Sequence, residues 1–270
     1  MLHDMRVYKS REELAVMRRS AKVAIEAHET AMRTCAPGMN EAEIHAGLMH
    51  TFIRNQCEAS YLPIVAGGAN ACVLHYITNN EELHDGDLLL IDAGAELDGY
   101  ASDITRTFPV GGKFSPEQRA LYDIVLEAQR QAIDTVRAGK QWQEVHDAAV
   151  RVATEGMIEL GIMKGELDQI LENKEFKRFY VHNTGHWLGL DVHDVGEYTI
   201  DGHSRELEPG MVLTVEPGIY IPPDTDDVDE CWRGMGIRIE DNVAVTREEP
   251  RILTDGLARS ADEIEDLMAA

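Results

Sequence analysis

Two segments of the chain resemble each other, and each carries a carboxylate at the end of a hydrophobic run. The first contains Asp92 in Leu-Leu-Leu-Ile-Asp-Ala-Gly, and the second contains Glu216 in Val-Leu-Thr-Val-Glu-Pro-Gly. Short hydrophobic runs of this kind are typical of buried strands. Each acid is therefore expected at the point where a buried strand opens onto a polar site.

A second acid follows each of these strands at a distance that suits an antiparallel hairpin. A four-residue turn at 96–99 in the first hairpin would place Asp92 opposite Asp103. A longer loop in the second hairpin would place Glu216 opposite Glu240. Directly opposed side chains on neighbouring strands lie only ~5 Å apart. Both hairpins are therefore expected to bring one acid against another.

Four carboxylates in this arrangement need protons or cations between them, because like charges opposed on a hydrophobic sheet destabilise it. Any one of these acids could be a solvated residue at a strand end. Two pairs at equivalent points of a repeat favour a common role instead. Hard oxygen ligands suit divalent cations, and a bridged pair of ions would balance four carboxylates. The acids therefore predict a metal site.

A histidine-rich segment offers the nitrogen ligand that such a site would use. It contains His182, His186 and His193. The spacing places the first two on one face of either a helix or a strand, so it does not choose a single ligand. Interspersed glycines favour an irregular segment over a helix. The HExxH pattern of zincins is absent.

The elements that must position these residues also occur twice. Ser10 and Ser115 each begin a capping box before a long segment of helical periodicity. Each segment runs to a glycine that is followed seven residues later by a histidine, His45 or His146, and then by a second helix. We expect these two histidines to be structural. Two helices followed by strands in each half predict an α+β fold.

The two halves are expected to be related by a pseudo-twofold axis within a single catalytic domain of residues 1–270. Their boundaries are roughly 10–110 and 115–247.

Charge and composition exclude several classes of protein. The chain has 270 residues, with 25 Lys and Arg against 49 Asp and Glu, a formal net charge of −24 and a pI near 4.7. Such acidity argues against nucleic-acid binding, and the hydrophobic runs are too short to span a bilayer. The four cysteines lack CxxC spacing and no leader is visible, so we expect a cytoplasmic protein.

Five separated blocks of the chain resemble those of the Xaa-Pro aminopeptidases (aminopeptidase P). They occur in the family's order at 90–94, 102–108, 182–194, 214–218 and 236–241. This family belongs to the pita-bread metallopeptidases, together with prolidase and methionine aminopeptidase. The resemblance extends from about Arg6 to the C-terminus. It implies a pita-bread fold with a curved, mostly antiparallel sheet, and a proline-specific metalloprotease that acts as an aminopeptidase.

The resemblance also implies a ligand set. The residues that match the family's metal ligands are Asp92, Asp103, His186, Glu216 and Glu240. Asp103 and Glu240 match carboxylates that bridge two divalent ions. Asp92 matches a ligand of one ion, and His186 and Glu216 match ligands of the other. Manganese is the expected metal, and Zn²⁺ or Co²⁺ could bind as well.

Further residues match positions around the metals. His75 resembles a histidine on the substrate side, and His182 and His193 match histidines that contact the substrate or the ligands. Arg238 resembles an arginine that supports the site. The expected reaction is attack on the N-terminal Xaa-Pro bond by a hydroxide that bridges the two ions. His193 would polarise the carbonyl, and Glu216 would move the proton to the leaving nitrogen.

Three alternatives stay open. A prolidase-type dipeptidase shares nearly all of these motifs and would need a cationic pocket for the substrate's C-terminal carboxylate. Methionine aminopeptidase fits the length but not the segment that contains Trp187. A non-catalytic peptide-binding protein is the third, although all five ligands are present. We expect peptides with proline at the second position as substrates, absence of the family's usual N-terminal domain, and compatibility with a homo-oligomer.

Overall fold

Helices and short antiparallel strands make up residues 2–270, which the computed structural model describes. The α-helices in this range are α1 (Leu2–Val7), α2 (Arg11–Thr34), α3 (Glu41–Arg54), α4 (Pro116–Thr135), α5 (Trp142–Glu159), α6 (Leu167–Glu172) and α7 (Ala261–Ala269). The 3₁₀ helices are η1 (Gly68–Cys72), η2 (Glu175–Arg178) and η3 (Glu230–Trp232). Mixed helices and sheets confirm the predicted α+β class.

Every strand ladder in this part of the chain is antiparallel. The strands of the first half are β1 (Glu58–Ala59), β2 (Ile64–Gly67), β3 (Leu88–Asp92), β4 (Ala95–Leu97), β5 (Tyr100–Ala101) and β6 (Thr105–Pro109). Those of the second are β7 (Thr199–Ile200), β8 (His203–Ser204), β9 (Val212–Val215), β10 (Gly218–Ile221), β11 (Met235–Arg238), β12 (Asp241–Ala244) and β13 (Arg251–Ile252).

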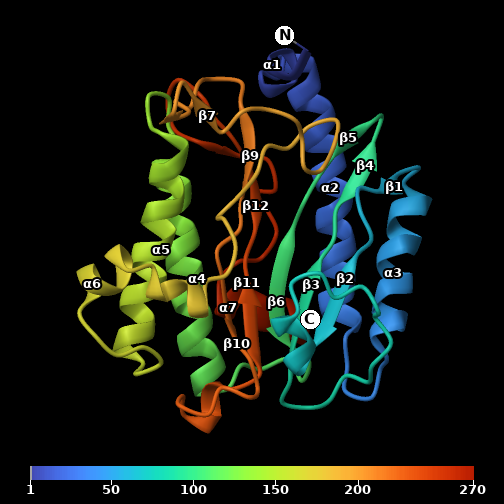
Figure 1. Ribbon diagram of the computed structural model, residues 1–270. Helices are drawn as coiled ribbons and strands as arrows, with labels where there is room; N and C mark the ends of the chain where they lie inside the picture. Colours follow the sequence, from blue (N-terminus) through green and yellow to red (C-terminus); the bar gives the residue numbers. More distant parts are fainter. Residues whose placement is uncertain (1) are drawn as a thin grey trace.

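Two pairs of long helices flank the strands, α2 with α3 on one side and α4 with α5 on the other (Figure 1). The predicted capping boxes are present, because Ser10 and Ser115 accept hydrogen bonds from the third residue of α2 and α4. The buried face of α2 carries alanines at helical spacing, including Ala24, Ala27 and Ala31. Small side chains let the helix lie close to the sheet.

The turn after the first helix of each pair is the same in both halves. Gly38 and Gly139 have φ angles of 87° and 88°, which favour glycine. The N–H of Gly38 donates to Leu83 O, and the N–H of Gly139 donates to Leu207 O. These equivalent contacts tie each helix pair to the loop that precedes its acid-bearing strand, as the internal repeat of the sequence leads one to expect.

The turn of the first acid-bearing hairpin is shorter than the sequence analysis predicts. Strands β4 and β5 pair Leu97 with Tyr100, so the turn contains only Asp98 and Gly99. Both turn residues have positive φ, at 52° and 81°. A type I′ turn requires such angles and favours Asp-Gly, because its twist matches that of the strands. The predicted four-residue turn is wrong.

The shorter turn moves the register by two residues. Asp92 pairs with Thr105, not with Asp103 as predicted. A shift of two keeps every side chain on its own face of the sheet, whereas a shift of one would reverse it. The two acids therefore still converge, as diagonal rather than direct neighbours, and the hydroxyl of Tyr61 contacts both of them.

The second hairpin has the predicted register. Strands β10 and β11 pair Ile221 with Met235. Strands β9 and β12 pair in the same register. A short interruption of the ladder of paired residues separates them from β10 and β11. Glu216 and Glu240 fall in that interruption and face each other across it. The interruption frees these two side chains from the regular ladder.

A seam of hydrogen bonds joins the two halves beside these acids. The N–H of Glu240 donates to Thr105 O at 3.0 Å. Behind it, Arg106 donates to Asp241 Oδ1 at 2.9 Å, with both side chains fully buried. Arg106 also donates to the carbonyl of Glu240 at 2.6 Å. These four residues, Thr105, Arg106, Glu240 and Asp241, are called the inter-half seam below.

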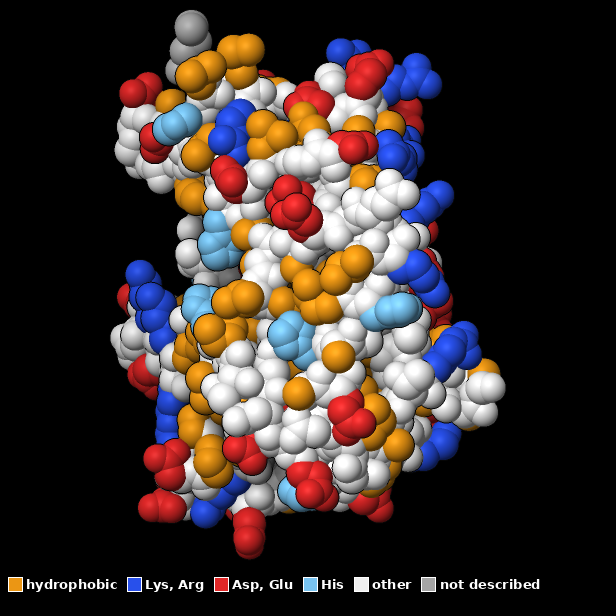
Figure 2. Space-filling model, turned by 90° about the vertical axis from the view of Figure 1, so that its right-hand side faces the viewer, with side chains coloured by type: hydrophobic (Ala, Val, Ile, Leu, Met, Phe, Trp, Pro, Cys, Tyr) orange, Lys and Arg blue, Asp and Glu red, His pale blue; other side chains and the backbone are white. Residues whose placement is uncertain are grey.

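The acidic side chains on one face of the molecule are scattered rather than gathered in one patch. Figure 2 views the molecule from the side of α3, and Asp and Glu side chains are scattered over that face among Lys and Arg. Exposed hydrophobic side chains also occur in this half, including Ile53, Leu62 and Val73. Within residues 2–270, no helix has the length and hydrophobicity needed to cross a membrane.

Candidate metal centre

One cavity of about 230 Å³ collects every predicted site residue. The predicted residues that line it are His75, Asp92, Asp103, His182, His186, His193, Glu216, Arg238 and Glu240. Two acids and one histidine come from the first half, and the others come from the second. The structure therefore brings together residues that lie up to 165 positions apart, between His75 and Glu240 (240 − 75).

Three of the predicted ligands have atoms close enough to share one ion. A carboxylate oxygen of Asp103, one of Glu240 and a ring nitrogen of His186 all lie within 4.8 Å of one another. His186 Nε2 lies 3.3 Å from Asp103 Oδ2 and 3.5 Å from Glu216 Oε1. Its Nδ1 lies 3.0 Å from the carbonyl of Trp187. When Nδ1–H donates to that carbonyl, Nε2 is free to bind a metal.

Glu240 tests whether a cation fits among these residues. Its Oε2 accepts a hydrogen bond from Thr105 Oγ1 at 2.7 Å. Its Oε1 is buried and has no hydrogen-bond partner within the described part of the chain. Buried oxygens are rarely left unpaired. A divalent cation between Glu240, Asp103 and His186 would satisfy this oxygen, so the donor set fits a metal ion.

Burial and crowding change the proton affinities of the cluster. Burial and then the neighbouring carboxylates raise the pKa of Asp103 and of Glu240. Burial raises the pKa of Glu216 to about 7, although His186 and Arg238 act in the opposite direction. Burial would lower the pKa of His186, but Asp103 and Glu216 outweigh it and raise this pKa to about 9. Without metal, the cluster therefore holds protons in place of cations.

Asp92 is held by a cationic side chain and a hydroxyl. Arg238 Nη2 donates to Asp92 Oδ2 at 2.6 Å, and Tyr61 OH donates to Oδ1 at 2.5 Å. Tyr61 also contacts Asp103. Burial and the nearby acids raise the pKa of Tyr61 well above its usual value, so it remains a donor. The sequence analysis missed Tyr61, because it lies in a loop and belongs to no motif.

A hydrogen-bonded chain leads from Arg238 to His182. Arg238 Nη1 donates to Tyr220 OH at 2.8 Å, and this hydroxyl lies 2.8 Å from His182 Nε2. His182 Nδ1 lies 2.7 Å from Asn183 O, so Nδ1 carries the proton and Nε2 accepts from the tyrosine. Burial and Arg238 lower the pKa of His182 to about 4, which makes the ring neutral at pH 7. Tyr220 was also missed, although an even spacing from Glu216 suits the same strand face.

His193 and His75 lie on the remaining wall of the cavity. The ring centroid of His193 is 4.2 Å from that of His186, with an angle of 64° between the planes. Burial, and then the charge of His186, lowers the pKa of His193. In the described residues, neither His193 nor His75 forms a hydrogen bond, so their ring N–H groups are available to a ligand.

A buried carboxylate anchors the loop that carries His75. The side chain of Glu41, at the start of α3, is completely buried and has no cationic partner in residues 2–270. Its four hydrogen-bond donors are the N–H of Gly67 at 2.8 Å, Asn70 Nδ2 at 3.0 Å, Tyr76 OH at 2.7 Å and the N–H of Glu81 at 3.0 Å. The sequence analysis missed this role, because Glu41 looks like an ordinary acid in a first helical turn.

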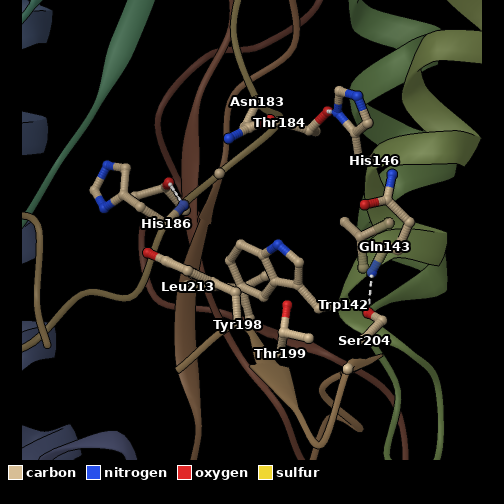
Figure 3. Close-up of a pocket in the computed structure, with 14 residues that line it drawn as sticks. Trp142, Gln143, His146, Asn183, Thr184, His186, Tyr198, Thr199, Ser204 and Leu213 are labelled. Carbon is tan, nitrogen blue, oxygen red and sulfur yellow. Dashed lines mark hydrogen bonds between the residues drawn. The ribbon is translucent and has the colours of Figure 1, made fainter. Parts of the chain in front are cut away.

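The segment that carries His186 separates this cavity from a neighbouring one. Figure 3 shows the imidazole of His186 pointing away from α5, whereas Trp142 and His146 lie on the α5 side. The predicted structural role of His146 agrees with its contact to Thr184 Oγ1 at 2.8 Å. The neighbouring cavity of about 420 Å³ lies between α5 and the strands.

Known proteins match this arrangement over nearly the whole chain. The model of metallopeptidase family M24 matches residues 15–247. The chain belongs to metallopeptidase family M24. An M24 relative, the Xaa-Pro aminopeptidase of Escherichia coli (strain K12), is 49% identical over 100% of this chain and 61% of its own length. The Xaa-Pro aminopeptidase of Haemophilus influenzae is 48% identical over 99% of this chain and 62% of its own length. The chain thus spans about three fifths of the length of these relatives.

Solved structures give the same result for the fold. The Pseudomonas aeruginosa aminopeptidase PepP has a TM-score of 0.98 and 52% identity, over 99% of this chain and 61% of its own. Zinc-substituted E. coli aminopeptidase P in complex with product has a TM-score of 0.96 and 49% identity, over 99% of this chain and 61% of its own. This likeness confirms the predicted pita-bread fold of the M24 chain.

Proposed function

We propose that this M24 chain is a metal-dependent aminopeptidase that hydrolyses the N-terminal Xaa-Pro bond of peptides. The observation that carries the proposal is a cluster of four acids and His186, with the unpaired Oε1 of Glu240 among them. The chain is also 49% identical to an Xaa-Pro aminopeptidase. We further propose one catalytic domain with half-repeats at 10–110 and 115–247. A cytoplasmic location and a homo-oligomer remain predictions.

The proposed ligands are the five residues that the resemblance implies. They are Asp92, Asp103, His186, Glu216 and Glu240, with Asp103 and Glu240 shared between two ions. Two divalent cations bound there would supply Lewis-acid activation of the attacking water and of the scissile carbonyl. An oxygen-rich set with one imidazole suits Mn²⁺, and Zn²⁺ or Co²⁺ would compete for it.

Glu216 is the proposed proton carrier. Its carboxylate lies in the cavity among the other proposed ligands, where it could accept a proton from a water held there and pass it on. Thr214 Oγ1 donates to Glu216 Oε1 at 3.2 Å and orients it. The leaving group of an Xaa-Pro bond is the nitrogen of a tertiary amide, which must receive a proton as it departs. Glu216 would take that proton from the attacking water.

The histidines have different proposed roles. His193 and His75 have ring N–H groups that are free to donate to the oxygen that becomes negative as the carbonyl is attacked. Both ring nitrogens of His182 are engaged, one with Asn183 and one with Tyr220. His182 would therefore hold the tyrosine in place rather than donate to the substrate. The substrate's amino group would lie near the acids, which attract its positive charge.

The test is a manganese-dependent assay of the purified chain on an Xaa-Pro-Xaa peptide. We expect release of the first residue, and no cleavage of a matched peptide with alanine in place of proline. Cleavage of an Xaa-Pro dipeptide alone would make the chain a prolidase-type dipeptidase. A folded chain that binds two metal ions per molecule and cleaves none of these peptides would refute the enzymatic function and favour a peptide-binding role.

A further inference from the structure

Another cavity, different from the one of about 420 Å³ described above, lies beside the metal centre and is lined by cationic side chains. It has a volume of about 510 Å³ and lies between α5, α6, η2 and residues 180–183. It shares two wall residues, His182 and Asn183, with the cavity of the metal centre. The two cavities therefore adjoin at this segment.

Two lysines on this cavity are the basis of the inference. Lys174 and Lys177 both line it, and in residues 2–270 neither side chain forms a hydrogen bond or an ion pair. Arg151 also lines it but is paired with Asp168 at 2.9 Å. We call this cavity, with Lys174 and Lys177 on its wall, the lysine groove. Their positive charges are therefore not neutralised by a carboxylate of the described residues.

The backbone holds the two lysines on one side of the groove. Lys174 has a φ of 57° and immediately precedes η2, and the N–H of Lys177 donates to Lys174 O at 3.2 Å. Residues three apart in a 3₁₀ helix lie on the same face, because this helix has about three residues per turn. Between them Phe176 is buried, which fixes η2 against the domain.

The other charged groups on the groove leave its wall cationic. Asp147 is the acid that lines it, and this carboxylate already accepts from Gln143 Nε2 at 2.8 Å. Burial lowers the pKa of His146. The negative charge of Asp147 raises this pKa, and the positive charge of Lys177 lowers it further. The ammonium group of Lys177 is thus near enough to the imidazole of His146, another wall residue, to influence it. Figure 3 shows that His146 and Gln143 project from α5 toward the segment with Asn183.

We propose that Lys174 and Lys177 bind the C-terminal carboxylate of short peptide substrates whose amino end lies at the acids of the metal centre. A short free peptide carries one positive and one negative end, and the two adjoining cavities present the opposite charges in the same order. This role rests on the proposed aminopeptidase function and makes short free-acid peptides the preferred substrate class. An extended chain covers about 3.3–3.6 Å per residue, so each added residue carries the C-terminal carboxylate farther from the metal centre and peptides of several lengths must be compared.

The test compares peptides that differ only at the C-terminus. Xaa-Pro peptides of three to five residues are assayed as free acids and as C-terminal amides, with the metal-loaded chain. We expect kcat/KM for at least one length to be roughly three- to tenfold higher for the acid, as suits one or two solvent-screened charge contacts. The preference should decrease as salt is added, because exposed charges are screened.

Substitution of one lysine locates the contact. Lys177→Glu should abolish or reverse the acid preference, because kcat/KM should fall more for the acid than for the amide. Lys22→Glu is the matched control, because it makes the same change in net charge at a residue that is exposed on α2 and does not line the groove. The control should retain the preference of the original chain.

Each outcome has a distinct meaning. Equal rates for acid and amide at every length, or an equal effect of Lys177→Glu and Lys22→Glu, would overturn the role of the lysine groove alone. Failure of the metal-loaded chain to cleave any Xaa-Pro peptide would overturn the proposed function, and the lysine groove's role in substrate selection with it.

Discussion

Removal of the metal should make the stability of the chain fall steeply between pH 7 and pH 8.5. The reason is that protons replace cations in the acidic cluster. His186 has a pKa of about 9 in the folded metal-free chain, above its ordinary 6.5, so its contribution to stability is complete below pH 6.5 and is lost as the pH rises through 9. Glu216, raised from 4.5 to about 7, likewise loses its contribution as the pH rises through 7.

The magnitude follows from these values. The proton on His186 contributes about 3 kcal/mol at pH 7 and about 1 kcal/mol at pH 8.5, a loss of about 2 kcal/mol. Glu216 adds a much smaller loss over the same range, because it is already half ionised at pH 7. The sum is a decrease of about 2 kcal/mol. His28 and His182, with pKa values lowered to about 4, destabilise the folded chain mainly below pH 6.5, so their effect between pH 7 and pH 8.5 is small and of opposite sign.

The measurement is the free energy of unfolding in urea at both pH values, with chelator and with saturating Mn²⁺. With chelator, we expect the decrease of about 2 kcal/mol. With Mn²⁺, the decrease should vanish or reverse, because cations take the place of protons and bind more tightly once the ligands are deprotonated. Ionisation elsewhere in the chain cancels in the difference between the two series. Identical pH profiles in both series would refute the proposed link between the buried acids and metal binding.

Three further predictions follow from particular contacts. Asp103→Ala should lower the metal content below two ions per chain and abolish peptidase activity, whereas His193→Ala should keep the metal and lose most turnover. Equal metal loss in the two variants, measured by elemental analysis, would contradict the assigned ligands. Gly94→Ala should destabilise the chain by about 3 kcal/mol in urea unfolding, because the new Cβ would lie 1.7 Å from a carbonyl oxygen; Gly47→Ala, with open space around it in α3, should stabilise by about 0.5–1 kcal/mol. Glu41→Gln should lower the free energy of unfolding by about 2 kcal/mol, because four hydrogen-bond donors lose their carboxylate acceptor. It should also reduce kcat with little change in metal content, because the loop with His75 loosens; an unchanged kcat would exclude that positioning role.

The two hairpins show how far the sequence determines the candidate site. Prolines at the end of a strand placed the loop of the second hairpin at 222–234, which correctly set Glu216 against Glu240. In the first hairpin strand periodicity allowed turns of two or four residues. The Asp98–Gly99 sequence favoured the shorter turn, and the error arose because that local signal was not used.

Contacts between distant segments account for what the sequence analysis missed. Tyr61 lies 31 and 42 residues before the two acids that it contacts, and nothing in its neighbours indicates that pairing. Glu41 resembles many acids in first helical turns, and only the folded loop reveals its four donors. Periodicity and motif spacing report local geometry. They do not report which loops pack together.

The inter-half seam gives the bound metal a mechanical role in addition to a chemical one. Asp92 and Asp103 belong to one repeat, and the other three proposed ligands belong to its partner across the seam. A cation held by both repeats acts as a crosslink between them, formed and broken by the concentration of metal rather than by covalent chemistry. Metal supply would therefore strengthen the contact between the repeats. In a chain cleaved between residues 110 and 115, the ions would add to the seam and the shared core that hold the two pieces together.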